Sequence, residues 1–148
     1  MKSRTVLMLA ALLIAASCTE RTQPVILEFR IAETEPSEGL TPMVFSGWGQ
    51  SDTFYVHSDV LLSADDVADA SVAMQDGFPI VALNLTEEGT KKFAEITGAN
   101  VGRHLGMVVD GTLLSAPVIR DTILFGRAQI TGDFSEQEAE RLADALSR

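Results

Sequence analysis

Cysteine and histidine are both scarce in this chain of 148 residues. The single cysteine, Cys18, excludes an internal disulfide, a zinc site built on thiolates and a redox pair of thiols. The two histidines, His57 and His104, belong to no HExxH motif, so a catalytic zinc site is not expected. Each histidine is expected to lie on the surface or at the rim of the fold.

Positive charge is also scarce, because 11 basic residues stand against 21 acidic ones and the net charge is −10. Removing residues 1–17 takes away Lys2 and Arg4 and no acid, which leaves 9 basic residues against 21 acidic ones, a net of −12. A domain this acidic repels phosphate backbones and anionic lipid. Nucleic acid is therefore excluded as a partner, and so is a basic membrane-binding face. The acidic side chains are interpreted as a solvated surface that keeps the domain soluble.

The motifs of the common enzyme classes are missing as well. The chain has no Walker A loop, no GxSxG elbow and no EF-hand loop, and Gly47-Trp48-Gly49 is a bare GxG without the rest of a dinucleotide fingerprint. The acidic pairs Asp65-Asp66 and Glu87-Glu88 fall in the first turns of predicted helices, where the helix dipole explains them. The sequence predicts no enzyme, no cofactor and no metal. A hydrolase of an unrecognised type is the alternative in the enzyme class.

The N-terminal segment has the pattern of a bacterial lipoprotein signal. Lys2 and Arg4 precede the apolar run Val6–Ala16, which is shorter than the roughly 20 residues that span a bilayer. Small residues then lead to Cys18, which is expected to carry the lipid anchor, palmitate included. We therefore predict a signal peptide at 1–17, a tether at 18–24 and a domain at 25–148. An ordinary cleaved signal peptide and an uncleaved anchor are the alternatives.

The expected location is the periplasmic face of the cell envelope. Thr19 follows the cysteine, whereas aspartate at this position is the familiar inner-membrane retention signal of Gram-negative bacteria. This favours the outer membrane, and the inner membrane stays open.

The remaining chain predicts an α+β domain, a mostly antiparallel sheet with helices packed on one face. Val25, Leu27, Phe29 and Ile31 alternate as one face of a strand, and Asp110-Gly111 predicts a hairpin turn. The expected elements, in chain order, are a strand at 25–31, a long loop at Glu33–Asp52, a strand at Thr53–Ser58, a helix at Ala64–Met74, a strand at 81–85, a helix from Thr86 to Gly98, strands at Leu105–Val109 and Leu113–Ile119, a strand at Ala128–Phe134 and a C-terminal helix capped by Ser135.

Ordered motifs in the second half of the chain resemble the first periplasmic head subdomain of SecD, an accessory subunit of the bacterial preprotein translocase. They are Leu83-Asn-Leu-Thr-Glu-Glu-Gly-Thr-Lys-Lys-Phe-Ala-Glu-Ile-Thr97, Gly102-Arg-His-Leu-Gly-Met-Val-Val-Asp-Gly111, Leu114-Ser-Ala-Pro-Val-Ile119 and Arg127-Ala-Gln-Ile-Thr-Gly132. The resemblance covers about residues 25–148. It implies a SecD head-like fold in a periplasmic setting and, as the inherited expectation, contact with exported polypeptide. We find no motif for the transmembrane helices or base subdomain of SecD, so a stand-alone lipoprotein is expected.

The loop at Glu33–Asp52 supplies the candidate contact residues Met43, Val44, Phe45 and Trp48, because methionine and aromatic side chains are enriched in recognition surfaces. The alternative is that these side chains fold back over the sheet. The predicted function is a membrane-tethered binding module that contacts unfolded or translocating polypeptide, or a translocase component, in protein export. The rival is a structural envelope lipoprotein, a tethered spacer with no client.

Overall fold

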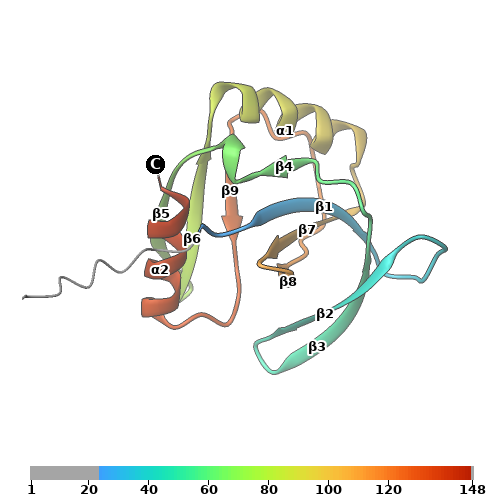
Figure 1. The fold of residues 1–148 in the computed structure, drawn as a ribbon, viewed down its shortest axis with the longest axis horizontal. Helices are drawn as coiled ribbons and strands as arrows, with labels where there is room; N and C mark the ends of the chain where they lie inside the picture. The colour runs from blue at the N-terminus through green and yellow to red at the C-terminus, as the bar shows by residue number, and fades with distance from the viewer. Residues whose placement is uncertain (1–23, 148) are drawn as a thin grey trace, which may run out of the picture.

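The computed structural model describes residues 24–147. The predicted signal peptide, Cys18 and most of the tether lie outside the described residues. The elements in chain order are β1 (Leu27–Glu33), β2 (Thr41–Gly47), β3 (Gln50–Val56), β4 (Leu62–Ser63), the 3-10 turn η1 (Ala64–Asp66), β5 (Val67–Gln75), β6 (Phe78–Leu85), α1 (Glu87–Ala99), β7 (His104–Val109), β8 (Thr112–Ser115), β9 (Arg127–Ile130) and α2 (Glu136–Leu146) (Figure 1).

Within residues 24–147 the strands form two antiparallel sheets. The larger has the order β2-β3-β1-β7-β8, with β4 also paired to β1, and the smaller has the order β5-β6-β9. The strands of the larger sheet curl so that β2, at one end, approaches β8 at the other. The prediction of an α+β fold with mostly antiparallel strands is confirmed, and the strands are divided between two sheets.

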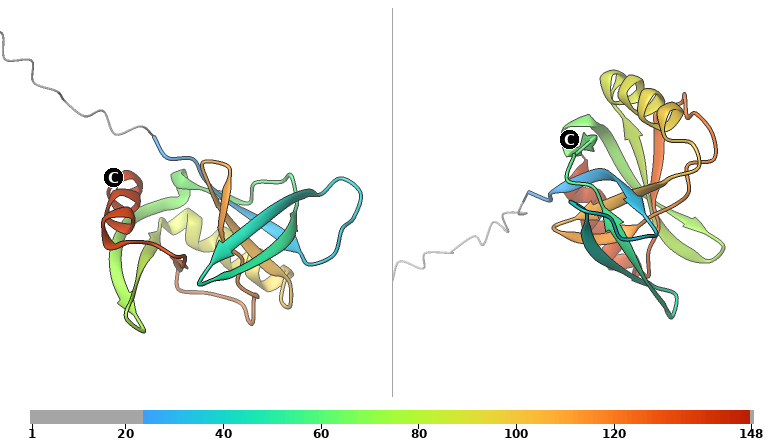
Figure 2. Two further views of the ribbon diagram at one scale, coloured as in Figure 1. Left: turned by 90° about the horizontal axis from the view of Figure 1, so that it is seen from below. Right: turned by 90° about the vertical axis from the view of Figure 1, so that its right-hand side faces the viewer.

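The main core lies between the two sheets and is closed by the helices. The alternating strand that the sequence predicts places Leu27, Phe29 and Ile31 of β1 in this core. Phe93 of α1 meets Phe29 edge to face, with ring centroids 6.3 Å apart. Both helices contact β6, and α2 also packs on β5, as the views in Figures 1 and 2 show.

Local capping sets the ends of both helices. The Thr86 hydroxyl accepts a hydrogen bond from the amide of Gly89 at the start of α1. Ser135, the predicted cap of the C-terminal helix, forms a capping box with Glu138 at the start of α2. Four side chains of α2 form its buried face: Ala139, Leu142, Ala143 and Leu146.

The predicted loop at Glu33–Asp52 is wrong, because most of it is the β2–β3 hairpin. Trp48 and Gly49 form its turn with φ of 50° and 75°, the positive pair that a type I′ hairpin turn requires. Met43 and Phe45 pack on a second, smaller cluster of Ala32, Val56, Val108 and Leu113. The turn escaped prediction because tryptophan seldom occupies a left-handed backbone conformation.

The predicted helix at Ala64–Met74 is also wrong. Ser63 and Asp66 form a capping box, but it caps only the short turn η1, and β5 follows. The pairing of β5 with β6 shifts register between Val67 and Asp69. This irregularity adds a residue, so Val67 and Ala70 are both buried in the core. Their spacing of three therefore resembles that of a helix, whereas Met74, the next apolar residue at helical spacing, is 62% exposed.

Candidate functional site

The β2–β3 hairpin separates the four predicted contact residues into two pairs. Met43 and Phe45 face inward and are partly buried against the smaller cluster. Val44 and Trp48 face outward, with 56% and 50% of their surfaces exposed. The rings of Phe45 and Trp48 stay in contact, with centroids 6.3 Å apart. The second pair is therefore the more open to a partner, and Phe45 also lines a small hollow beside Trp48.

The outer edge of β2 approaches β8 without pairing with it, and its outward main-chain groups have no partner among the strands that the structure describes. Gly47 and Gln50 flank the two-residue turn, so they form a hydrogen-bonded pair, and the pairs along the hairpin alternate from there. Ser46 and Val44 fall at the alternate positions, so their N–H and C=O groups point away from β3. The adjacent Pro42 has no N–H to offer. This edge therefore presents two residues, next to the exposed Trp48.

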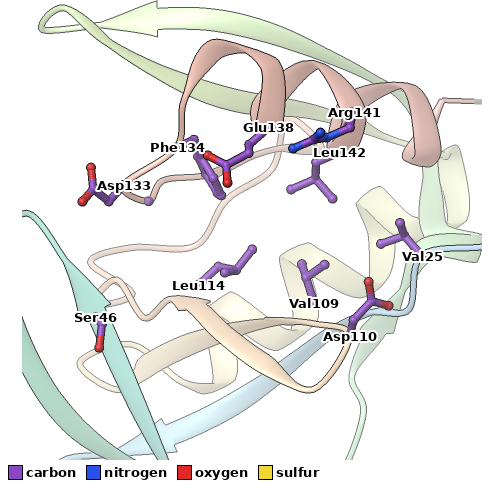
Figure 3. Close-up of a pocket in the computed structure, with 11 residues that line it drawn as sticks. Val25, Ser46, Val109, Asp110, Leu114, Asp133, Phe134, Glu138, Arg141 and Leu142 are labelled. Carbon is purple, nitrogen blue, oxygen red and sulfur yellow. The ribbon is translucent and has the colours of Figure 1, made fainter.

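A cleft of about 500 Å³ begins at Ser46 and runs between α2 and the β7–β8 hairpin (Figure 3). Figure 3 shows Phe134, Glu138, Arg141 and Leu142 along the α2 wall, with Leu114 and Val109 opposite. Val25, from the start of the described chain, closes the far end. Its apolar lining comes from separate segments of the chain: Val25, Val109, Leu114, Phe134 and Leu142.

The rim of the cleft is charged and mostly acidic. Asp110, Asp133 and Glu138 stand there with one guanidinium, that of Arg141. Hydrogen bonds from Ser135 hold the pKa of Glu138 below its ordinary value, so this carboxylate stays ionised at neutral pH. The Asp110 carboxylate accepts a 2.9 Å hydrogen bond from the amide of Ile26, which fixes the entry of the chain into β1.

Both histidines have neighbours that explain them structurally. His57 Nε2 lies 3.2 Å from Glu33 Oε1, in a network that Arg103 completes. The Arg103 guanidinium beside Glu33 holds the pKa of that carboxyl below its ordinary value. His104 Nδ1 lies 2.7 Å from the carbonyl oxygen of Ala116, and the imidazole packs on Phe54.

The acidic pair at the start of η1 also has a structural role. Asp66 is only 7% exposed, and its carboxylate accepts a hydrogen bond from the amide of Ser63. The same carboxylate forms an ion pair with Lys92, with Nζ and Oδ1 2.7 Å apart. The hydrogen bond to Asp66 raises the pKa of Lys92. Over residues 24–147 no group of His, Cys, Asp and Glu side chains is arranged to hold a metal ion.

Sequence reasoning missed most of the cleft. Its lining residues have ordinary structural roles: Ser46 belongs to a hairpin, Leu114 to a strand and Leu142 to a helix, and Phe134 lies in the connection between β9 and α2. The predicted cap at Ser135 and the predicted Asp110-Gly111 turn did locate the two walls. No sequence signal indicated that those walls face each other.

The comparison with protein families decides the identity of the fold. Residues 42–148 match the model of the family described as "SecDF, P1 head subdomain". The chain belongs to this family. The resemblance found in the sequence is thereby confirmed for the head domain, and its lipoprotein character stays a prediction.

SecD and SecDF proteins with similar head sequences come from diverse bacteria. The protein translocase subunit SecD of Acidaminococcus fermentans is 42% identical over 92 residues, 62% of this chain and 22% of that protein. SecDF of Thermus thermophilus is 48% identical over 87 residues, 58% of this chain and 12% of that protein. The chain thus spans less than a quarter of the length of either relative.

Solved SecDF structures share the head fold. One, described as a membrane component that enhances protein export, superposes with a TM-score of 0.67 and 32% identity, covering 84% of this chain and 63% of that one. Another, of SecDF in a super-membrane-facing form, gives a TM-score of 0.68, also at 32% identity, and covers 84% of this chain and 19% of that one. In residues 24–147 of this P1 head protein, no helix is long and apolar enough to cross a membrane.

Proposed function

We propose that this protein is a membrane-tethered module on the periplasmic side of the cell envelope, and that its head domain holds extended, unfolded polypeptide during protein export. The family and the description of the SecDF relative as enhancing protein export support the setting. A component of the translocase is a further candidate partner. The cleft between α2 and the β7–β8 hairpin is the observation that carries the polypeptide-binding part.

The cleft suits a polypeptide of varied sequence. Its apolar lining can take up side chains without requiring particular hydrogen bonds, since Val109, Leu114, Phe134 and Leu142 lack polar side-chain atoms. The free edge of β2 at Val44 and Ser46 adds main-chain hydrogen bonds, which do not depend on the sequence of the bound chain. An extended segment paired with this edge would pass Trp48 and Ser46 and enter the cleft.

Binding through these features is expected to be weak. The edge offers few main-chain groups, and the bound segment loses conformational freedom when it becomes ordered. A dissociation constant between about 1 μM and 1 mM, or about −8 to −4 kcal/mol, fits that balance. Weak binding also suits a module that must release a moving chain.

Peptide binding tests the proposal with a matched pair of variants. The probe is a fluorescently labelled peptide in which valine and glutamine alternate, titrated with the purified protein and read by anisotropy. Trp48→Asn removes the exposed indole at the β2–β3 turn and is expected to weaken binding at least about threefold. Phe78→Thr removes an equally exposed ring at the end of the β5–β6 hairpin and serves as the control. Equal binding by both variants would contradict the assignment of the site.

The tether is proposed to be a lipid on Cys18. The chain enters the described domain at Pro24 and Val25, and Val25 lines the cleft, so the anchor connects beside the binding site. Cys18→Ser removes the acyl acceptor and is expected to move the protein from the membrane fraction to the soluble fraction. Detection of an unmodified N-terminus by mass spectrometry would contradict lipidation. Fractionation of inner and outer membranes tests the favoured outer-membrane location.

The spacer function stays the second candidate, because Met43 and Phe45, two of the four predicted contact residues, pack inward. Absence of binding to the peptide up to about 1 mM would favour the spacer.

A further inference from the structure

A second groove separates the two sheets at the connection from β8 to β9. The segment 116–119 continues β8 along the start of β7, where Leu105 N donates to Pro117 O and Ile119 N donates to Arg103 O. Val118 lies between these bonded residues, opposite His104. Its own N–H and C=O therefore point away from β7.

The strand β9 presents a matching edge. Leu85 N donates a hydrogen bond to Gly126 O at 2.8 Å. Hydrogen-bonded and non-hydrogen-bonded residue pairs alternate along the β6–β9 register from that point. The main-chain N–H and C=O groups of Ala128 and Ile130 consequently point toward β6. Those of Arg127 and Gln129 point away from β6. Among residues 24–147, no hydrogen bond is made by the outward main-chain groups of Val118 or Gln129.

A cavity of about 450 Å³ lies between the two edges. Leu105, Met107 and Ile119 contribute its apolar lining, and Pro117 and Gln129 belong to opposite walls. At one end the walls are tied together, because Ser115 Oγ and Thr131 Oγ1 lie 3.0 Å apart. The opening is thus a gap between two unpaired strand edges with an apolar side.

The groove also carries positive charge that this acidic protein leaves without partners. Arg30, Lys91, Lys92 and Arg103 each form an ion pair. Arg120 and Arg127 line the groove and form none within the described part of the chain. Asp121 lies there too, with its carboxylate accepting a hydrogen bond from the amide of Thr122.

We propose that this groove is a separate binding site for an extended, acidic polypeptide segment, inserted as a strand between Val118 and β9. The main-chain groups of the two edges bind its backbone, the apolar side receives alternate side chains, and Arg120 and Arg127 bind its carboxylates. The inserted strand connects the two sheets through one continuous hydrogen-bonded ladder. This site is independent of the cleft beside α2.

Three short peptides of about eight residues test the proposal against the whole purified protein. One alternates valine with glutamate, one alternates valine with lysine, and the third is the glutamate peptide with alternate amides N-methylated. The glutamate peptide is expected to bind at least about tenfold more tightly than either of the others. Equal affinity for the lysine peptide would overturn the charge assignment, and equal affinity for the methylated peptide would overturn strand insertion.

Hydrogen exchange locates the peptide. Bound glutamate peptide is expected to slow amide exchange at Val118 and Gln129. Protection at Val44 and Ser46 instead would overturn this site while leaving the cleft proposal standing. Arg127→Gln and Arg120→Gln are each expected to weaken binding about three- to tenfold, and Lys91→Gln on α1 serves as the control. Equal effects of all three substitutions would show only a general response to charge and would overturn the assignment of the two arginines.

Discussion

Phe45 and Trp48 touch each other, yet substitutions of the two are expected to act on different properties. Phe45 packs largely buried against Val56, Val108 and Leu113, whereas Trp48 is an exposed side chain, with 50% of its surface accessible. Replacing a fully buried phenylalanine by alanine costs about 3–5 kcal/mol, so Phe45→Ala should cost about 2 kcal/mol. For a domain of this size, that is a fall in Tm of about 6–10 °C.

Trp48→Asn should leave the stability nearly unchanged. Trp48 has a φ of 50°, a left-handed conformation that costs a bulky side chain about 1 kcal/mol and that asparagine adopts more readily. Losing the contact with the Phe45 ring costs about 0.5–1 kcal/mol, which offsets the gain. The net change in the free energy of unfolding is therefore within about 0.5 kcal/mol.

Thermal and urea unfolding of both variants, followed by peptide titration, measures the two properties separately. Phe45→Ala is expected to unfold at a lower temperature, and Trp48→Asn is expected to bind less peptide at an unchanged Tm. A large fall in Tm for Trp48→Asn would refute the reasoning, because it would make the indole a structural side chain. Unchanged stability of Phe45→Ala would show that the smaller cluster contributes little.

The remaining predictions concern stability. Gly111→Val should cost more than about 1 kcal/mol in urea unfolding, because Gly111 has a φ of 80° in the type I′ turn; an unchanged midpoint would contradict the turn. Gly126→Ala should cost about 1–3 kcal/mol, since the added Cβ would lie 2.0 Å from Thr90 Oγ1, and combining it with Thr90→Ala should recover part of the loss in a double-mutant cycle. Glu33→Gln should lower the Tm at neutral pH. Arg103 holds the pKa of Glu33 in the folded protein below its ordinary value of 4.5. The ion pair therefore stabilises the folded state fully above pH 4.5, and this stabilisation is lost as the pH falls through the folded pKa. A difference in Tm that does not shrink in acid would argue against this ion pair.

The sequence determined the features whose causes lie within a few residues. The positive φ at Asp110 and Gly111, the hydroxyl caps at Thr86 and Ser135 and the buried stripe of α2 depend on local backbone and side-chain chemistry. The ordered motifs after Val81 also identified the head family. Such signals are readable because neither a turn nor a cap needs a distant partner.

Tertiary structure decided which strands meet and what they leave open. The bulge beside Val67 gave β5 a helical spacing, and only pairing with β6 makes that segment a strand. The position of β2 across from β8 buries Met43 and Phe45 and leaves Val44 and Trp48 exposed. The cleft and the groove each combine segments far apart in the chain, as Val25 with Leu142 and Leu105 with Gln129. Burial and edge exposure depend on all of these contacts at once, because a strand's second neighbour is chosen by the packing of the whole domain and not by its own residues.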